Sequence, residues 1–354
     1  MKTLSQKKPA ISIIIPMYNL EKYIEECLLS VLIQTFQDFE VIVVDDCSTD
    51  KSVSIVESFI PRFNGKLNLI KLKKNSGNAG EPRNVGLRHS SGKYIFFLDG
   101  DDLITHTALE ELYSYTNDES IDIIHSDNNF VPFKFNSSSN EYMSTEEIDD
   151  NTVFRMVTSE KHTNPLFETD DLSERMTRFV QRRFWSTVWR NLYSRKFIED
   201  NGINFSDALL LEDDLFTFQC LCCAKKILNI PNVFYIYRMR KTSLSHNSSS
   251  HKHDQKIDTM MKLFNLLDKF MTGKELFVDK PEVKYMVFTF FAKKLTSTLT
   301  QVEPYELDSL LRRKLSEDLE GNLALMAYSF NMMNFYNYHF IESEKKREKL
   351  KIND

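Results

Sequence analysis

The sequence predicts an α/β fold in which a doubly wound, mostly parallel sheet is followed by an appended helical region. Short apolar runs alternate with helical patterns over the first part of the chain, as in a sheet whose strands are joined by helices. Each of the first three runs stops at polar, chemically capable residues. From His253 onward the pattern is helical throughout. We therefore divide the 354 residues into a domain of residues 1–250 and a helical region of residues 251–354.

The predicted strands are short and almost continuously apolar. Such runs occupy residues 11–15, 41–44 and 94–98, and they are typical of strands buried on both faces of a parallel sheet. A further strand is predicted over residues 121–127. Ligands bind such sheets at the carboxyl ends of the strands, so we expect the site among the polar residues that follow them.

The segments between these strands carry helical patterns. In residues 21–34 the apolar side chains fall on one side of a helix. Residues 48–59 open with Ser-Thr-Asp and residues 105–115 open with Thr, and both openings are N-cap signals. These helices would supply the crossovers that parallel strands require.

Patterns in the middle of the chain are weaker. Residues 135–168 are rich in Ser, Asn, Asp and Glu, and we interpret them as a long loop or irregular excursion. Helices are predicted over residues 172–184 and 211–226, and a strand over residues 233–240. The C-terminal helices are predicted from apolar stripes at Met260, Met261, Phe264 and Leu267 and at Met286, Phe288, Phe291 and Leu295.

Composition and charge exclude several classes of protein. The net charge of -6 provides no broad basic field, so we expect no nucleic-acid partner. The five cysteines match no disulfide framework, and we interpret Cys220, Cys222 and Cys223 as helix interior because no partnering pair stands at zinc spacing. Residues 1–9 lack the apolar core of a signal peptide, and no apolar run could span a bilayer. We therefore expect a cytoplasmic protein, soluble or peripheral.

A carboxylate pair follows the third strand. Asp99 and Asp101 flank Gly100, and alternate residues of a strand point the same way. Two hard oxygen ligands would then face one point, which suits Mg²⁺ or Mn²⁺ rather than a soft metal. Such an ion could stabilise a diphosphate leaving group. A solvated acidic turn is the alternative interpretation.

Two further segments could contact a nucleotide. Asp46 follows an apolar strand, where its carboxylate could accept a hydrogen bond from a nucleobase or could cap a helix. Residues 75–86 form a glycine-containing loop that runs into a helix, with Arg83 near the helix N-terminus, where an anion is favoured. The glycine spacing fits neither a dinucleotide fingerprint nor a P-loop.

Three acidic residues open a later helix. Glu212, Asp213 and Asp214 could be ordinary partners of the helix dipole. The functional alternative is a general base that takes a proton from an acceptor hydroxyl.

Together these segments resemble glycosyltransferase family 2, whose members have the GT-A fold, and especially its wall teichoic acid N-acetylglucosaminyltransferases. The match is close over residues 11–127 and looser over residues 185–246. The resemblance rests on the motifs Ile-Ile-Pro-Met-Tyr-Asn, Val-Val-Asp-Asp-Cys-Ser-Thr-Asp, Asn-Ser-Gly-Asn-Ala-Gly-Glu-Pro-Arg-Asn-Val-Gly, Phe-Leu-Asp-Gly-Asp-Asp and Glu-Asp-Asp-Leu-Phe.

The resemblance implies an inverting transfer of a sugar from a UDP-sugar to a hydroxyl of a cell-surface glycan or glycopolymer, such as a teichoic acid, capsule or lipooligosaccharide. Asp213 would be the general base, and Mn²⁺ or Mg²⁺ the cofactor. Asp99 and Asp101 would ligate the metal. The implied donor-binding residues are Pro16, Tyr18, Asn19, Asp46, Arg83 and Asp99. Asp214 departs from the family pattern, in which an amide often follows the Glu-Asp pair, so the choice of base stays open.

The resemblance also implies a segment that closes over the diphosphate. This segment contains Arg238, Arg240, Ser243 and His246, and His246 is a further metal candidate. Asp127, Trp185 and Glu212 are candidates for contact with the acceptor or diphosphate. Trp185 and Trp189 are spaced by one helical turn. Their rings could form the floor of the acceptor site, where a sugar stacks on them, or they could form a buried pair.

Other interpretations remain open at this point. The basic residues 345–351 are a solvated helix end or a contact with an anionic membrane surface or acceptor. A phosphatase of the haloacid dehalogenase type also has Asp-x-Asp after an apolar strand, but at the first strand and followed by Thr. A non-catalytic nucleotide-sugar binding module is the third possibility.

Overall fold

The structure is a computed structural model, and it divides into two compact units, residues 1–243 and 244–354, which are described separately below. The residues that the structure describes are 8–136, 139, 141–158, 162–182, 184, 186–207, 211–240 and 253–297.

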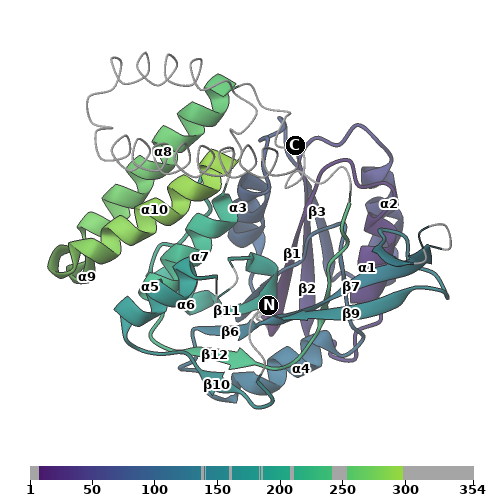
Figure 1. Ribbon diagram of the computed structural model, residues 1–354. Helices are drawn as coiled ribbons and strands as arrows, with labels where there is room; N and C mark the ends of the chain where they lie inside the picture. The colour runs from purple at the N-terminus through teal and green to yellow at the C-terminus, as the bar shows by residue number, and fades with distance from the viewer. Residues whose placement is uncertain are drawn as a thin grey trace, which may run out of the picture. The chain divides into compact units, whose positions relative to one another are not determined.

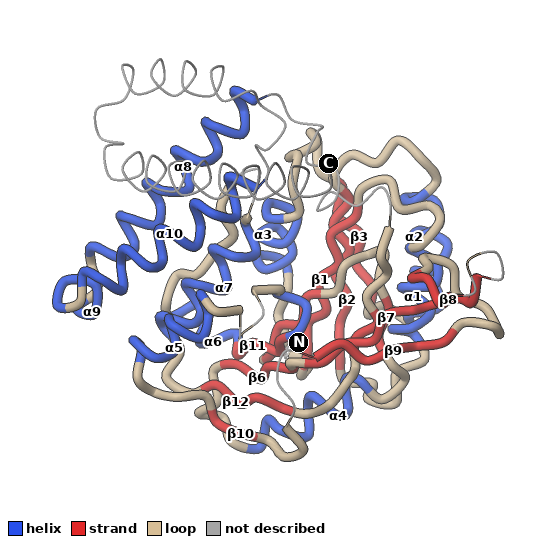
Figure 2. The backbone as a smooth tube through the Cα atoms, viewed as in Figure 1, coloured by secondary structure: helices blue, strands red, loops and turns tan. Residues whose placement is uncertain are grey.

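An eight-stranded sheet forms the centre of the first unit (Figures 1 and 2). Its strands, in spatial order, are β10 (Leu166–Phe167), β12 (Ile227–Ile230), β6 (Ile123–Ser126), β11 (Asn191–Ser194), β4 (Tyr94–Phe97), β1 (Ile11–Met17), β2 (Phe39–Asp45) and β3 (Leu67–Lys71). Strands β4, β1, β2 and β3 are mutually parallel, and β6 is parallel to β12. β11 and β10 run antiparallel to their neighbours. The predicted mostly parallel sheet is confirmed.

Helices cover both faces of this sheet. The helices of the unit are α1 (Ile24–Leu32), α2 (Ser52–Phe59), α3 (Gly80–His89), α4 (Ala108–Ser114), α5 (Leu172–Val180), α6 (Arg195–Asp200) and α7 (Glu212–Cys223). Ile13 and Ile15 of β1 pack in one core with α1 and α2. Ile42 and Val44 of β2 point to the other face, where they meet Val85 of α3. Alternating strand residues therefore serve two helical layers, which is the doubly wound arrangement (Figure 1).

The prediction of an irregular excursion over residues 135–168 is wrong in part. β7 (Asn128–Asn136) pairs antiparallel with β8 (Glu141–Ser144) on one side and with β9 (Val153–Thr158) on the other. β13 (Tyr235–Ile236) joins β7 to β5 (Leu103–Ile104), which completes a second sheet. The polar turns between these short strands dilute their alternating pattern, so the sequence window shows little periodicity.

Several element boundaries also differ from the predictions. α2 begins at Ser52 rather than at residue 48, because Asp50 accepts hydrogen bonds from the Ser52 N–H and hydroxyl. The predicted Ser-Thr-Asp opening therefore precedes the helix, whose N-cap position is Lys51. The strand predicted over residues 233–240 shortens to Tyr235–Ile236. β3 was not predicted, and its burial is only partial because it lies at the edge of the sheet.

The second unit contains three described helices, α8 (His253–Thr272), α9 (Glu275–Asp279) and α10 (Pro281–Ser297). Phe264 of α8 stacks on Phe288 of α10 with ring centroids 5.6 Å apart, and Lys284 pairs with Asp268 at 2.6 Å. The predicted stripe residues Phe264, Leu267, Phe288 and Phe291 are buried. The basic residues 345–351 lie outside the described residues. Among the helices that the structure describes, none is long and apolar enough to cross a membrane.

Candidate functional site

The loops after β1 and β2 are joined at the carboxyl edge of the sheet. The strand register places Met17 beside Asp45. Beyond them, Asn19 adopts a left-handed conformation with φ 51°, and its side-chain oxygen accepts a hydrogen bond of 2.7 Å from the Thr49 N–H. Pro16 lies in β1, and the Tyr18 residue next to this junction is 47% exposed. Tyr18 therefore has free surface for a ligand, whereas Asn19 shapes the loop.

Asp46 lies against the loop that precedes α3. Its carboxylate accepts hydrogen bonds from the Ser76 N–H at 2.8 Å and from the Ser76 hydroxyl at 2.9 Å. Burial raises the pKa of Asp46, and the hydrogen bonds from Ser76 oppose that rise. A carboxylate offers about four acceptor positions, so a nucleobase N–H can still be accommodated. The predicted nucleotide contact of Asp46 remains a prediction.

The loop after β4 carries three aspartates that are fixed in different ways. A Cβ on Gly100 would lie 2.8 Å from the Leu20 side chain and 3.1 Å from the Pro16 carbonyl, so close approach rather than turn geometry requires glycine there. Asp102 is buried and accepts hydrogen bonds of 2.8 Å from the Tyr235 hydroxyl and from the Arg238 N–H. Burial, with the charges of Asp101 and Asp99, raises the pKa of Asp102 well above its usual range.

Arg83 joins two of the predicted site carboxylates. Its Nη2 donates to Asp99 Oδ1 at 2.8 Å, and its Nη1 donates to Asp213 Oδ1 at 2.7 Å. Glu212 lies 3.9 Å from the same Nη1. Burial lowers the pKa of Arg83, but Asp213, Asp99 and Glu212 outweigh it, and the net shift is upward. The sequence predicted these residues separately, and the structure brings them together.

The packing of α3 explains why residues 130 positions apart meet. A Cβ on Gly80 would lie only 3.0 Å from the Ser206 carbonyl, so the start of α3 lies directly against the segment that leads to α7. The Asn84 side chain stabilises this contact with two hydrogen bonds. Its amide donates to the Phe205 carbonyl and its oxygen accepts from the Phe205 N–H, both at 2.9 Å. Arg83 lies over the Phe205 ring at 5.3 Å. Neither Phe205 nor Tyr235 was predicted as a site residue, because neither lies in a recognisable motif.

The acidic residues at the start of α7 have different surroundings. The Asp213 side chain is 27% exposed, whereas Asp214 is buried with 6% exposure. Asp213 Oδ2 accepts no hydrogen bond from the described residues. Burial raises the pKa of Asp213 to about 8, against the opposing charge of Arg83. Burial raises the pKa of Glu212 as well. Of the two aspartates, Asp213 is the one that a substrate can reach.

Two arginines after β13 pair with different carboxylates, and one of these carboxylates is a predicted metal ligand. Arg240 forms an ion pair with Asp101, and Arg238 forms one with Glu26 of α1. Both guanidinium groups lie near the Tyr23 ring, at 5.7 Å for Arg238 and 5.1 Å for Arg240. Tyr23 also donates a 3.1 Å hydrogen bond to Glu146, which follows β8. Ser243 and His246, the other residues predicted for this segment, lie outside the described residues.

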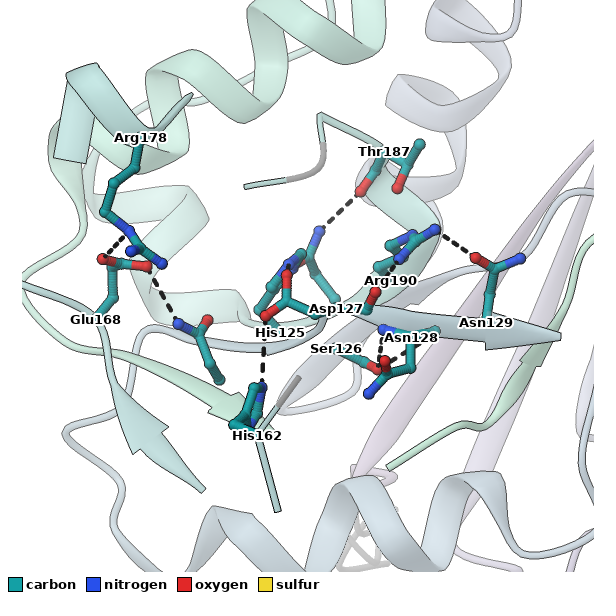
Figure 3. Close-up of polar contacts among 12 residues, drawn as sticks. His125, Ser126, Asp127, Asn128, Asn129, His162, Glu168, Arg178, Thr187 and Arg190 are labelled. Carbon is teal, nitrogen blue, oxygen red and sulfur yellow. Dashed lines mark hydrogen bonds and ion pairs between the residues drawn. The ribbon is translucent and has the colours of Figure 1, made fainter. Parts of the chain in front are cut away.

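Asp127 belongs to a separate buried cluster (Figure 3). Its carboxylate lies 3.2 Å from Nε2 of His125 and 3.4 Å from Nε2 of His162, and its carbonyl accepts a 2.7 Å hydrogen bond from Arg190. Asp127 is only 2% exposed, so internal contacts surround it. In the described part of the chain, no hydrogen bond or ion pair links this cluster to Arg83. Contact between Asp127 and the acceptor remains a prediction.

Trp189 lies in a short 3₁₀ segment (Val188–Arg190) rather than in a longer helix. Ser186 and Thr187, which precede this segment, are not helical. Trp189 is buried and stacks on Tyr235, with ring centroids 4.1 Å apart. Trp189 therefore supports the Tyr235 ring, whose hydroxyl donates a hydrogen bond to Asp102. Trp185 lies outside the described residues.

The carboxylates of Asp99 and Asp101 suit a divalent cation that also binds a diphosphate. The side chains of Asp99 and Asp101 are both partly exposed, and burial, together with the negative charge of Asp99, raises the pKa of Asp101. Mg²⁺ is typically held by one or two carboxylates together with substrate phosphates, so Asp99 and Asp101 are enough protein ligands for such a site. Among the described residues, no group of three or more His, Cys, Asp or Glu side chains could hold a metal by itself. The donor set therefore suits a hard metal that arrives with a phosphorylated ligand.

The fold and the site define an α/β domain with a ligand site at the carboxyl edge of a doubly wound sheet. Residues 12–173 match the family model described as Glycosyl transferase family 2. Residues 12–173 belong to this family, as the motifs in this part of the chain predicted.

Its relatives include bacterial glycosyltransferases. The uncharacterized glycosyltransferase EpsJ of Bacillus subtilis is 30% identical over 238 residues, which cover 67% of this chain and 63% of EpsJ. TarS of Staphylococcus aureus, a poly(ribitol-phosphate) beta-N-acetylglucosaminyltransferase, is 31% identical over 255 residues, which cover 71% of this chain and 39% of TarS. The chain thus spans less than two thirds of the length of either relative.

A solved structure agrees in fold. The crystal structure of S. aureus TarS 1–349 in complex with UDP aligns with a TM-score of 0.59 and 23% identity, covering 84% of this chain and 76% of that one. The likeness confirms the predicted GT-A-like fold.

Proposed function

We propose that this protein is an inverting glycosyltransferase that moves a sugar from a UDP-sugar to a hydroxyl of a cell-surface glycan or glycopolymer. One observation carries the proposal. Asp99, at the end of β4, and Asp213, at the start of α7, bind the same guanidinium, so a donor site and a base candidate lie within one side chain of each other. The family membership and the kinship with TarS, itself an N-acetylglucosaminyltransferase, support this assignment.

The donor would lie along the carboxyl edge of the sheet. Tyr18 offers an exposed ring in the loop after β1, and the Asp46 carboxylate after β2 would accept the uracil N–H. Asn19 would shape this site through its hydrogen bond from Thr49, and Pro16 would contribute to it from β1. Asp99 and Asp101 would hold a divalent cation, which neutralises the diphosphate when it is bound. Arg240 pairs with Asp101, and the Arg238 N–H binds the neighbouring Asp102, so both arginines would face the diphosphate from the segment after β13.

The reaction would be a single displacement. The acceptor oxygen forms a bond to the anomeric carbon while the bond from that carbon to the diphosphate oxygen breaks, and the electron pair of that bond leaves with UDP. The acceptor proton moves to the Asp213 carboxylate. A base works best when its pKa lies near the operating pH, and the pKa of Asp213 is about 8. Attack from the face opposite the leaving group inverts the anomeric centre.

Residues 1–250 would form the catalytic domain. We also propose a cytoplasmic location with peripheral contact at the membrane, where lipid-linked or polymeric acceptors are assembled. Family membership leaves the phosphatase alternative without support.

A panel of nucleotide sugars tests the function. The protein is incubated with Mn²⁺ and UDP-GlcNAc, UDP-glucose, UDP-galactose or GDP-mannose, and nucleotide release is measured. Slow release of UDP from at least one UDP-sugar is expected, because water can replace the acceptor. Asp101→Asn should abolish this release. Asp118→Asn, which removes an exposed carboxylate paired with Lys226, is the control and should retain it. Donor binding without any release, with or without a glycan acceptor, would instead support a non-catalytic binding module.

A further inference from the structure

The buried guanidinium of Arg83 has no surface to offer a donor. Its side chain is 3% exposed, and its two terminal nitrogens are already engaged by Asp99 and Asp213. The third nitrogen, Nε, is buried and has no hydrogen-bond partner among the described residues. The centroid of the Phe205 ring lies 5.3 Å from the guanidinium carbon, and the ring covers one face of the guanidinium. Contact with a nucleotide or diphosphate would therefore require the groups that bury Arg83 to move aside.

The two carboxylates belong to parts of the site with different tasks. Asp99 follows β4, on the side of the proposed donor, whereas Asp213 opens α7, on the side of the proposed acceptor. An arginine fork can bind two carboxylates at once because its nitrogens diverge in a fixed plane, which the single ammonium of lysine cannot reproduce. The hydrogen bonds of 2.8 Å and 2.7 Å therefore set the spacing between these two elements.

The bridge also orients the base. Oδ1 of Asp213 is bound by Arg83, while Oδ2 accepts nothing from the described residues and the side chain keeps 27% of its surface. A carboxylate held through one oxygen presents the other in a defined direction. The anchoring of α3 itself is firm, since Asn84 forms two 2.9 Å hydrogen bonds with Phe205 in the next segment.

We propose that Arg83 is a positioning residue of the transfer reaction, which aims Asp213 at the acceptor hydroxyl and holds it at a fixed distance from the donor-side Asp99. This inference rests on the proposed function. It replaces the direct donor contact that the sequence predicted for Arg83. Loss of the bridge should slow the chemical step, since a base displaced by about 1 Å can cost on the order of 10²-fold in rate.

The test compares Arg83→Ala, Arg83→Lys and Arg88→Ala. Arg88 is the matched control, because it lies on the same helix but forms an exposed ion pair with Glu81 at 2.8 Å. UDP release from the best UDP-sugar is measured together with the affinity for UDP by calorimetry, and thermal melting confirms folding. We expect kcat to fall by about 10²-fold in both Arg83 variants. UDP affinity should change little in them, and Arg88→Ala should match the wild-type protein.

Chemical rescue separates positioning from a structural role. Guanidinium chloride at non-denaturing concentration should restore activity to Arg83→Ala by at least about tenfold. Methylammonium chloride, which supplies charge without the fork, should not. The proposal is overturned if UDP affinity falls in proportion to the activity, if kcat is unchanged, or if guanidinium fails to rescue a folded Arg83→Ala protein. A wild-type protein that releases UDP from no UDP-sugar would refute the proposed function instead.

Discussion

Replacement of Asp213 by Asn is the perturbation that most sharply separates binding from chemistry. Asn keeps the size of the side chain and can still accept a hydrogen bond from Arg83, but it cannot take up the acceptor proton. A positioned base contributes about 10²–10⁴-fold in rate, so we expect transfer to fall by that factor. Asp213 is bound to Arg83 and faces no nucleotide-binding loop in the described contacts, so UDP affinity should stay nearly constant.

Two neighbouring variants supply the controls. Asp214→Asn changes a buried carboxylate of the same helix turn, and Glu212→Gln changes a group 3.9 Å from Arg83. A partner of the helix dipole is worth about 1 kcal/mol of stability and should give no selective loss of turnover. The assay is single-turnover transfer at saturating donor, with calorimetric UDP affinity measured in parallel. If Asp214→Asn abolishes transfer and Asp213→Asn does not, the choice of base is wrong. If none of the three variants affects transfer, the inverting mechanism at α7 must be abandoned.

Three further outcomes follow from the site. UDP-sugar turnover should vanish with a chelator and return with Mn²⁺ or Mg²⁺, and Asp101→Asn should weaken metal and donor binding together; full activity after exhaustive chelation would contradict this. UDP should bind more tightly than ADP or GDP in calorimetry, and Asp46→Ala should erase the preference, whereas equal affinities in the wild-type protein would refute the nucleobase contact. Because burial raises the pKa of Asp213 from 3.8 to about 8, the folded state retains this proton while the unfolded state loses it over that range. Wild-type stability should therefore decline relative to Asp213→Asn as pH rises from about 4 to about 8, and melting curves with a pH-independent difference would argue against the shift.

The sequence predicted the part of the fold that depends on local pattern. Continuous apolar runs identified β1, β2 and β4, because strands buried on both faces carry no polar alternation. The same logic failed for β8 and β9, whose exposed residues and polar turns resemble a loop. β3, a partly buried edge strand, lacked the full apolar run and was missed for a related reason.

The candidate site could be predicted only where its residues follow strand ends or open helices. Asp46, Asp99 and Asp213 stood at such positions. The bridge through Arg83 could not be foreseen, since it depends on the close approach of Gly80 to Ser206, 126 positions later in the chain. Tyr235, which fixes Asp102, lies in a two-residue strand with no motif of its own. Tertiary packing determines such contacts, and a single sequence does not record them.

The stereochemistry of donor cleavage tests the central claim most directly. UDP-GlcNAc carries its sugar in the α configuration, and proton NMR can observe the first sugar released to water before the anomers equilibrate. A single displacement assisted by Asp213 predicts that β-GlcNAc forms first in the presence of Mn²⁺, and that Asp213→Asn suppresses its formation. Initial release of α-GlcNAc would contradict the inverting mechanism, and no release from any UDP-sugar would contradict the proposed enzyme activity.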